Sequence, residues 1–299
     1  MTSIIALIAT IVGIALSMAN LVNTLLTISP KVTRPKKKSV PARTVVIQEA
    51  LGKFNEITEQ FHIEYQPIVN IESGRIVSVE ALARWDSPAL GKISPGEFIP
   101  LAESLGVTED LMVWVIKTAI KDLVGWGHQL PVSINVSPSD LESPVLISAV
   151  CHESAVASVD KTLIEIEVTE RAIAFNEKPY IAALKDFHAL KIRMKIDDFG
   201  TGDSSFKRFL ESPWAGLKID ISLIPDDVND RNRMAGVRAI ASLCRELGIE
   251  CIAEGIETPR QIEALLGAGI TRAQGFYFYR PMLTEAILDL LKTETTANE

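Results

Sequence analysis

Short apolar segments alternate with amphipathic stretches along most of this chain. Helical periodicity is clearest over 109–125, 178–190, 231–247 and 259–266. The apolar runs around these stretches predict eight strands, at 62–69, 76–83, 132–136, 163–168, 193–197, 216–219, 250–253 and 272–275. Strands that alternate with helices favour an α/β fold with a parallel sheet. Eight of them in about 250 residues predict a TIM-type (β/α)8 barrel.

The first two predicted strands differ from the rest because no helix separates them. Between them lies the polar segment around 72–74, which ends in Gly74. A gap this short joins antiparallel neighbours, whereas parallel strands need a longer crossover. The sequence therefore predicts a barrel with one antiparallel strand. An open doubly wound sheet is the alternative, because alternation alone cannot show that a sheet closes.

The first 30 residues contain no charged side chain. As a helix, the run 4–28 would be roughly 37 Å long at 1.5 Å per residue, which exceeds the roughly 30 Å hydrocarbon core of a bilayer. Six Lys and Arg residues follow between positions 31 and 43 without an acidic residue, so this flank should stay in the cytoplasm and the N-terminus should lie outside. We expect a transmembrane anchor over 1–30, a basic juxtamembrane linker over 31–49 and a globular domain over 50–299.

A cleaved secretory signal is the alternative for this apolar segment. Ser17 and Ala19 form a small-residue pair that a signal peptidase could recognise. The positive charges, however, follow the apolar run instead of preceding it, which is the reverse of a signal peptide. The charge order therefore favours the anchor.

Charge and cysteine content narrow the class of partner. The formal net charge is −8 and the sequence pI is about 5.2, so Lys and Arg are not in the excess that neutralises a DNA or RNA duplex. The three cysteines are too few and too scattered for a disulfide framework or a zinc knuckle. A small phosphate ester stays compatible with an acidic protein, because a bound metal can supply positive charge locally.

Polar side chains interrupt seven of the predicted strands, within or at the trailing end of each. In a barrel these ends converge on one face, where such folds build their active sites. Several carboxylates brought together would repel one another unless cations were bound. Oxygen ligands without His or Cys suit Mg²⁺ or Mn²⁺ better than zinc. The interrupting residues are Glu80, Asn135, Glu167, Asp197, Asp198, Lys218, Glu254 and Gln274.

Eight motifs in this order resemble the EAL phosphodiesterase family, and the resemblance covers roughly 61–289. It implies the EAL barrel fold and hydrolysis of cyclic di-GMP to linear pGpG in bacterial signalling, with two Mg²⁺ or Mn²⁺ ions that activate a water. The motifs are VEALARW around Glu80, FIPLAE at 98–103, SINVS at 133–137, IEIEVTE at 164–170, IDDFGTG at 196–202, LKID at 217–220, AEGIET at 253–258 and QGFYF at 274–278.

The resemblance also implies roles for the residues that interrupt the strands. Asp197 would bridge the two metal ions, and Glu254 would lie close to the second ion. Lys218 would contact the nucleophilic water and the phosphate, and Gln274 would orient the same water. The implied metal ligands are Glu80, Asn135, Glu167, Asp197 and Asp198. The implied catalytic residues are Lys218, Glu254 and Gln274.

Further residues are implied to contact the substrate or to control the site. Leu82 and Arg84 would bind the substrate, with Arg84 at a phosphate, whereas Gln66 resembles a pocket residue that we leave out of the catalytic set. Glu170 would anchor the Gly-rich loop 198–205. The chain departs from the usual family pattern at Asp203 and Ile221, which concerns regulation more than chemistry.

Two other classes of function stay open at this point. A catalytically silent receptor for cyclic di-GMP would signal through protein contacts, but receptors of this kind typically lose several metal ligands and this chain keeps them. A structural scaffold would need no ordered set of acids. The resemblance also implies homodimerisation. Together with the apolar N-terminus it predicts a single-pass protein of the bacterial inner membrane with its catalytic domain in the cytoplasm.

Overall fold

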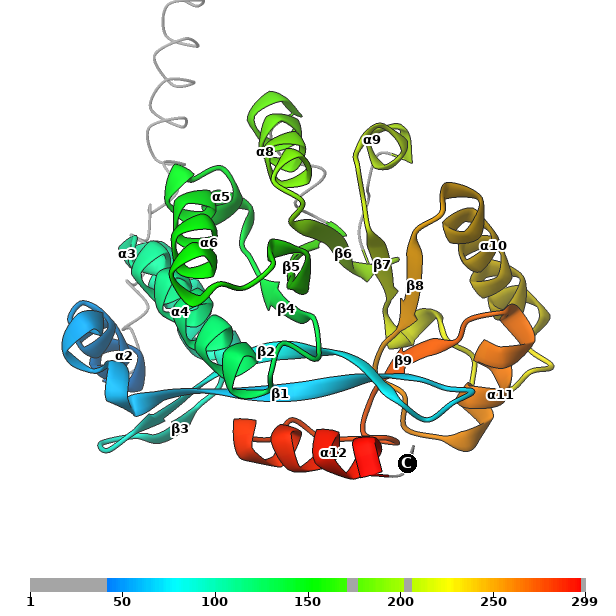
Figure 1. Ribbon diagram of the computed structural model, residues 1–299, viewed down its shortest axis with the longest axis horizontal. Helices are drawn as coiled ribbons and strands as arrows, with labels where there is room; N and C mark the ends of the chain where they lie inside the picture. The colour runs from blue at the N-terminus through cyan, green and yellow to red at the C-terminus, as the bar shows by residue number, and fades with distance from the viewer. Residues whose placement is uncertain (1–41, 171–176, 202–205, 297–299) are drawn as a thin grey trace, which may run out of the picture. The chain divides into compact units, whose positions relative to one another are not determined.

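Eight strands close into a ring in the computed structural model, which describes residues 42–170, 177–201 and 206–296 (Figure 1). The order around the ring is β1-β9-β8-β7-β6-β5-β4-β2, and β1 also pairs with β2. The ring strands are β1 (Phe61–Asn70), β2 (Ile76–Ser87), β4 (Val132–Asn135), β5 (Ile164–Thr169), β6 (Arg193–Phe199), β7 (Gly216–Ile219), β8 (Glu250–Ala253) and β9 (Arg272–Gln274). The prediction of a closed TIM-type barrel is confirmed. A short strand that the sequence pattern did not predict, β3 (Gly91–Ile93), pairs with the end of β2.

Strand β1 runs antiparallel to both of its neighbours, β2 and β9, while the other ring strands pair in parallel. The predicted reversed strand is therefore confirmed. The turn that reverses the chain is local: the Asn70 side-chain oxygen accepts hydrogen bonds from the backbone N–H groups of Glu72 and Ser73, at 3.1 and 2.9 Å. Gly74 follows with φ of 72°, a left-handed conformation that glycine adopts without steric cost.

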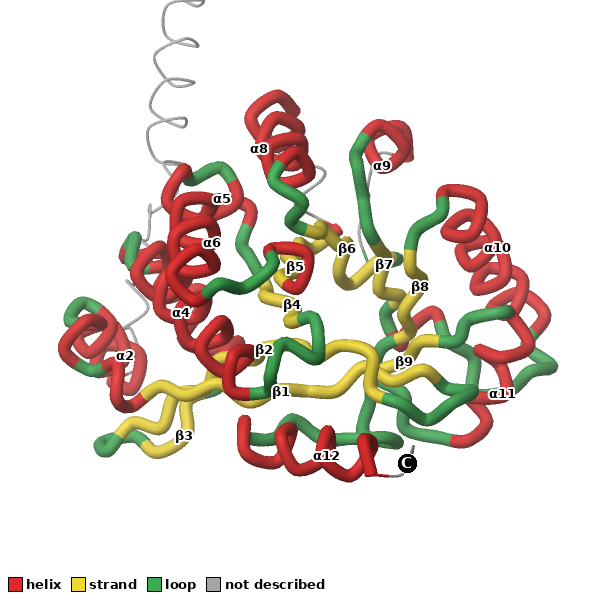
Figure 2. The backbone as a smooth tube through the Cα atoms, in the orientation of Figure 1, coloured by secondary structure: helices red, strands yellow, loops and turns green. Residues whose placement is uncertain are grey.

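Helices lie outside the ring of strands (Figure 2). The four predicted helices are confirmed as α4 (Thr108–Gly125), α8 (Glu177–Ala189), α10 (Arg231–Leu247) and α11 (Pro259–Ala268). The structure adds α3 (Pro95–Leu105), α5 (Pro138–Leu141), α6 (Pro144–Ala157), α9 (Phe206–Glu211) and α12 (Thr284–Thr296), with 3-10 turns η1 (Phe54–Glu56), η2 (Thr58–Gln60), η3 (Lys161–Leu163) and η4 (Ile221–Leu223).

Alternation along the ring strands separates an apolar outer face from a polar interior. On β5, Ile164, Ile166 and Val168 are buried with at most 1% exposure and belong to the hydrophobic core. The residues between them, Glu165 and Glu167, are equally buried but point to the other face of the strand. The inside of the barrel therefore holds charged side chains, which is where the site is built.

The first described helix, α2 (Ala42–Leu51), falls largely within the stretch that the sequence predicts as a linker. Ile47 and Leu51 lie four residues apart, share one helix face and are fully buried in the core. From Arg43 onward the chain is thus part of the packed barrel domain. The predicted anchor at residues 1–30, the rest of the linker and Asp203 lie outside the described residues. Among the helices that the structure describes, none combines the length and apolar character needed to cross a bilayer.

Candidate active site

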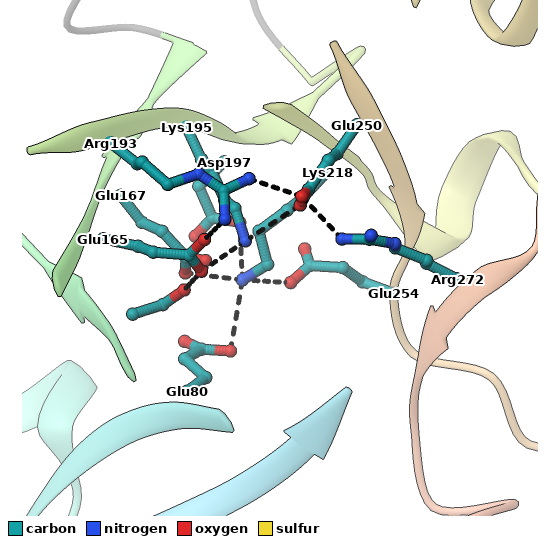
Figure 3. A network of polar contacts seen from close by, with 11 residues as sticks. Glu80, Glu165, Glu167, Arg193, Lys195, Asp197, Lys218, Glu250, Glu254 and Arg272 are labelled. Atoms are coloured by element: carbon teal, nitrogen blue, oxygen red, sulfur yellow. Dashed lines mark hydrogen bonds and ion pairs between the residues drawn. The ribbon is translucent and has the colours of Figure 1, made fainter. Parts of the chain in front are cut away.

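Lys218 on β7 lies inside the barrel among four carboxylates (Figure 3). Its Nζ is 2.7 Å from Glu167 Oε2, 3.1 Å from Glu80 Oε2, 3.3 Å from Asp197 Oδ1 and 2.5 Å from Glu254 Oε1. These acids come from β5, β2, β6 and the residue after β8. The side chains of Lys218 and Glu167 are fully buried. A buried ammonium stabilises the nearby acids, but one positive charge cannot balance four carboxylates.

Two amides fix the carboxylate of Glu80. Asn135 Nδ2 donates to Glu80 Oε1 at 2.6 Å, and Gln274 Nε2 donates to Glu80 Oε2 at 2.8 Å. Gln274 Nε2 also lies 3.1 Å from Gln66 Oε1, and Gln66 Nε2 donates to the carbonyl of Tyr279 at 3.1 Å. Gln66 therefore belongs to the hydrogen-bond network, although the sequence reasoning left it out of the catalytic set.

Asp197 and Asp198 are consecutive on β6, where regular alternation would send them to opposite faces. The pairing of β6 with β7 shifts register between Ile196 and Phe199, and Asp198 has φ of 54°. This irregularity re-aims a side chain, as bulges beside active sites do. Oxygens of Asp197, Asp198 and Glu254 lie within 4.8 Å of one another, and this is the one such acidic group found in the described part of the chain.

Burial and mutual repulsion shift the pKa values of these acids. Burial, with the negative charges of Glu80 and Asp197, raises the pKa of Glu167 to about 7 despite the attraction of Lys218. Burial also raises the pKa of Glu254 well above its usual range, and that of Asp198 above its ordinary value, where repulsion by Asp197 adds to it. The cluster therefore carries more negative charge than its surroundings favour.

Glu80 and Lys218 are shifted in the directions expected of a paired acid and base. Burial alone would raise the pKa of Glu80, but the charge of Lys218 and the hydrogen bonds from Asn135 and Gln274 hold it below its ordinary value. Burial opposes the charged form of Lys218, yet the surrounding acids, Glu167 first among them, raise its pKa well above the usual range. Lys218 thus stays protonated and Glu80 ionised near neutral pH.

The donor atoms fit a divalent cation. Glu167 Oε1 is buried and accepts no hydrogen bond from the described residues, and Asp197 Oδ1 is buried with the Lys218 Nζ at 3.3 Å but without hydrogen-bond geometry between them. Buried oxygens without a donor are costly, and a cation would both coordinate them and reduce the repulsion among the acids. Carboxylate and amide oxygens are the ligands that Mg²⁺ and Mn²⁺ prefer.

The residues expected to bind substrate or anchor the loop are placed beside this cluster. Leu82 and Arg84 follow Glu80 at two-residue spacing on β2 and therefore share its face. Arg84 Nε donates to Glu64 Oε2 at 2.7 Å, a partner that the sequence reasoning missed. Glu170 Oε2 accepts a hydrogen bond from the backbone N–H of Gly200 at 2.8 Å, which links the end of β5 to the segment after Asp198.

A second buried network inside the barrel was also missed by the sequence reasoning (Figure 3). Lys195 Nζ, fully buried, lies 2.5 Å from Glu165 Oε2 and 3.4 Å from Glu250 Oε2. Arg193 pairs with both Glu165 and Glu250, and Arg272 Nη1 lies 2.6 Å from Glu250 Oε1. The signal was present, since Glu165 and Lys195 each precede a site residue by two positions. Three cations here exceed two acids by one charge, so this layer has no excess of negative charge that a metal would neutralise.

Fold and site together define a TIM-type barrel protein with a candidate metal-dependent site at the carboxyl ends of its strands. The sequence model of the EAL domain matches residues 47–281, and the chain belongs to the EAL domain family. Its TIM-type barrel also matches solved structures of that family.

Proteins similar to this chain include phosphodiesterases of cyclic di-GMP. The cyclic di-GMP phosphodiesterase PA2567 of Pseudomonas aeruginosa is 31% identical over 261 residues, which are 86% of this chain and 44% of that protein. The structure of the PaMucR phosphodiesterase in complex with c-di-GMP superposes with a TM-score of 0.74 at 32% identity, over 81% of this chain and 99% of the other. The calcium and cy-diGMP complex of Klebsiella pneumoniae BlrP1 superposes with a TM-score of 0.65 at 28% identity, over 75% and 56% of the two chains. This chain spans 29% to 44% of the length of the first curated relatives that it matches.

Proposed function

We propose that this chain hydrolyses cyclic di-GMP to linear pGpG with a water activated by two divalent cations, Mg²⁺ or Mn²⁺. The observation that carries the proposal is the convergence of Asp197, Asp198 and Glu254 within 4.8 Å, directly beside the buried Lys218. The relatives named as cyclic di-GMP phosphodiesterases support the substrate.

Different residues of the site would hold the cations, stabilise charge on the phosphate and orient the water. Divalent cations at such a site lower the pKa of a bound water and stabilise charge on a phosphate. The Lys218 ammonium lies 3.3 Å from Asp197 and 2.5 Å from Glu254, so its positive charge would stabilise the negative charge that develops on the phosphate. Gln274 Oε1 is buried and accepts no hydrogen bond from the described residues, so it is available to accept a hydrogen bond from a water and orient it.

The competing function is a receptor that binds cyclic di-GMP without cleaving it. A receptor needs neither a group of acids close enough for a cation nor a lysine held among them, and this chain has both. The acid cluster therefore favours the enzyme over the receptor. A scaffold without a ligand would have no reason to bury four acids around one lysine.

The test uses the purified full chain with cyclic di-GMP and Mg²⁺ or Mn²⁺, with products separated by chromatography. We expect metal-dependent pGpG that EDTA abolishes and that falls to background in Glu80→Ala. Glu97→Ala is the matched control, because Glu97 lies at the surface in an ion pair with Arg43 and should leave turnover unchanged. Tight binding without turnover at saturating metal would establish the receptor instead, and no binding would reject both.

For the N-terminal segment we propose a single-pass anchor over 1–30 in the bacterial inner membrane, a basic linker up to the barrel domain, and a cytoplasmic catalytic domain. The uncharged run and the basic flank that follows it support this topology. Homodimerisation is proposed on family resemblance. Membrane fractionation with and without residues 1–30 tests the anchor; recovery of the intact chain in the soluble fraction would reject it.

A further inference from the structure

The guanidinium of Arg84 is held from two sides. Its Nε donates to Glu64 Oε2 at 2.7 Å, and its Nη1 donates to the backbone carbonyl of Ala83 at 3.1 Å. Both side chains of the ion pair are 24% exposed, so the pair is neither deeply buried nor freely solvated. Nη2 donates no hydrogen bond within the part of the chain that the structure describes, so this edge of the guanidinium is available to a ligand.

The pairing of β1 with β2 explains why Glu64 reaches Arg84. In the antiparallel register Glu64 stands opposite Leu82, and His62 stands opposite Arg84. Glu64 and Arg84 are therefore diagonal neighbours on one face, a spacing that long side chains can bridge. Gln66, two residues along the same strand, stands opposite Glu80. The face thus runs continuously from the acid cluster to the guanidinium.

The space beside this pair is open. A cavity of about 290 Å³ is lined by residues of β1, β2 and β3, including Glu64, Arg84, Trp85 and Lys92. A ligand that occupies the acid cluster and extends along β2 would meet Leu82 and then the guanidinium.

We propose that Glu64 is a positioning residue for the substrate: it orients the Arg84 guanidinium so that the free edge binds a phosphate of the cyclic dinucleotide. This inference rests on the proposed function, because it takes the same substrate. A free arginine must give up side-chain freedom when it binds a phosphate, whereas one already fixed at Nε and Nη1 gives up less. The Glu64 carboxylate is neutralised by the guanidinium that it holds, so its repulsion of the phosphate is reduced.

The experiment compares Glu64→Ala, Glu64→Gln, Arg84→Ala and the Glu64→Ala/Arg84→Ala double variant of the full chain. Because Glu64 acts on binding, we expect Glu64→Ala to raise KM about tenfold, the lower end of what loss of a residue that orients a metal ligand costs, with kcat unchanged. Glu64→Gln should stay within about twofold of the wild-type KM, because its amide oxygen still accepts from Nε. In the Arg84→Ala background, removal of Glu64 should have no further effect.

The control is Glu97→Ala, which removes another glutamate paired to an arginine Nε at 2.7 Å, on α3 and outside the residues that line the cavity. Its KM should equal that of the wild type. A Glu64→Ala variant with unchanged or lower KM, or one whose KM rises equally without Arg84, would overturn the proposal.

The failure of this proposal is separable from that of the proposed function. Wild-type turnover with no effect of Glu64→Ala rejects the positioning role alone. If the wild type binds but does not turn over cyclic di-GMP, dissociation constants measured by calorimetry with Ca²⁺ replace KM and the same pattern is required. If the wild type does not bind cyclic di-GMP, both proposals fall together.

Discussion

At the scale of the single residue, Lys218 acts as a counterion for the buried acids of the site. Its ammonium contacts Glu80, Glu167, Asp197 and Glu254 at 2.5 to 3.3 Å. The paired acids come from β2, β5, β6 and the residue after β8, so this one side chain links much of the ring. Loss of its charge would leave four carboxylates facing one another in a region that water hardly reaches.

We predict that Lys218→Met lowers the free energy of unfolding of the metal-free protein by about 3–5 kcal/mol, the usual cost of breaking a buried ion pair. Added Mn²⁺ should restore part of this loss, because a bound cation replaces the missing positive charge and stabilises the folded state. Urea unfolding at pH 7, with EDTA or with Mn²⁺, measures both effects.

Lys292→Met is the control for this measurement. Lys292 pairs with Asp289 on α12 and its side chain is 64% exposed, so its loss should change stability by less than about 1 kcal/mol. Equal stability of Lys218→Met and wild type would contradict the counterion role.

At the scale of the elements, what the sequence predicts is set by local periodicity. The apolar runs and the short gap before Gly74 predicted the ring strands and the reversed β1, because both signals lie within a few residues. Strand β3 was not predicted because three residues are too few to show a periodic pattern. Helix α2 escaped because Ile47 and Leu51 follow a basic segment, and their burial depends on the distant core.

The candidate site, too, was predictable from the sequence only where the signal lies within a single strand. Acids at strand ends were visible in the sequence, because barrel topology alone brings such ends together. The left-handed backbone conformation of Asp198 was not visible in the sequence, because it arises where β6 shifts register against β7. The pair of Glu64 with Arg84 and the second network around Lys195 depend on which side chains of neighbouring strands share a face, and single-strand patterns do not specify neighbours.

We predict that Glu250→Gln, on β8, lowers the free energy of unfolding by about 3–5 kcal/mol at pH 7, because it leaves Lys195, Arg193 and Arg272 short of one acid. Burial alone would raise the pKa of Glu250, but Lys195 and Arg193 outweigh it and hold the pKa below its ordinary value. The stabilisation by this carboxylate is therefore complete above its unfolded pKa of about 4.3 and is lost as pH falls through the lower folded value.

The measurement is urea unfolding of wild type and Glu250→Gln at about pH 7, 5 and 3.5. The difference between the two proteins should be largest at the upper values and smaller at the lowest. A difference that is constant over the whole range would show that the charge of Glu250 contributes nothing.

At the scale of the whole molecule, metal binding and stability are linked. A ligand that binds only the folded state at a hundred times its dissociation constant adds about 2.7 kcal/mol to the free energy of unfolding. We predict that Mn²⁺ raises the melting temperature of the wild-type chain reversibly, and that Asp197→Asn removes most of this increase. Differential scanning fluorimetry with Mn²⁺, then EDTA, measures it. An equal increase in Asp197→Asn would place the bound metal elsewhere.

The reversed strand β1 also decides on which side the polypeptide joins the barrel. Phe61, the first residue of β1, stands opposite Trp85, five positions beyond Glu80 on β2. In an all-parallel barrel the first strand would begin at the opposite end, far from the carboxyl ends of the other strands. Here the start of β1 and the candidate site lie at the same end of the barrel. A pull or a twist applied through α2 would reach Glu64 and Gln66 along a single strand, without first crossing the body of the domain.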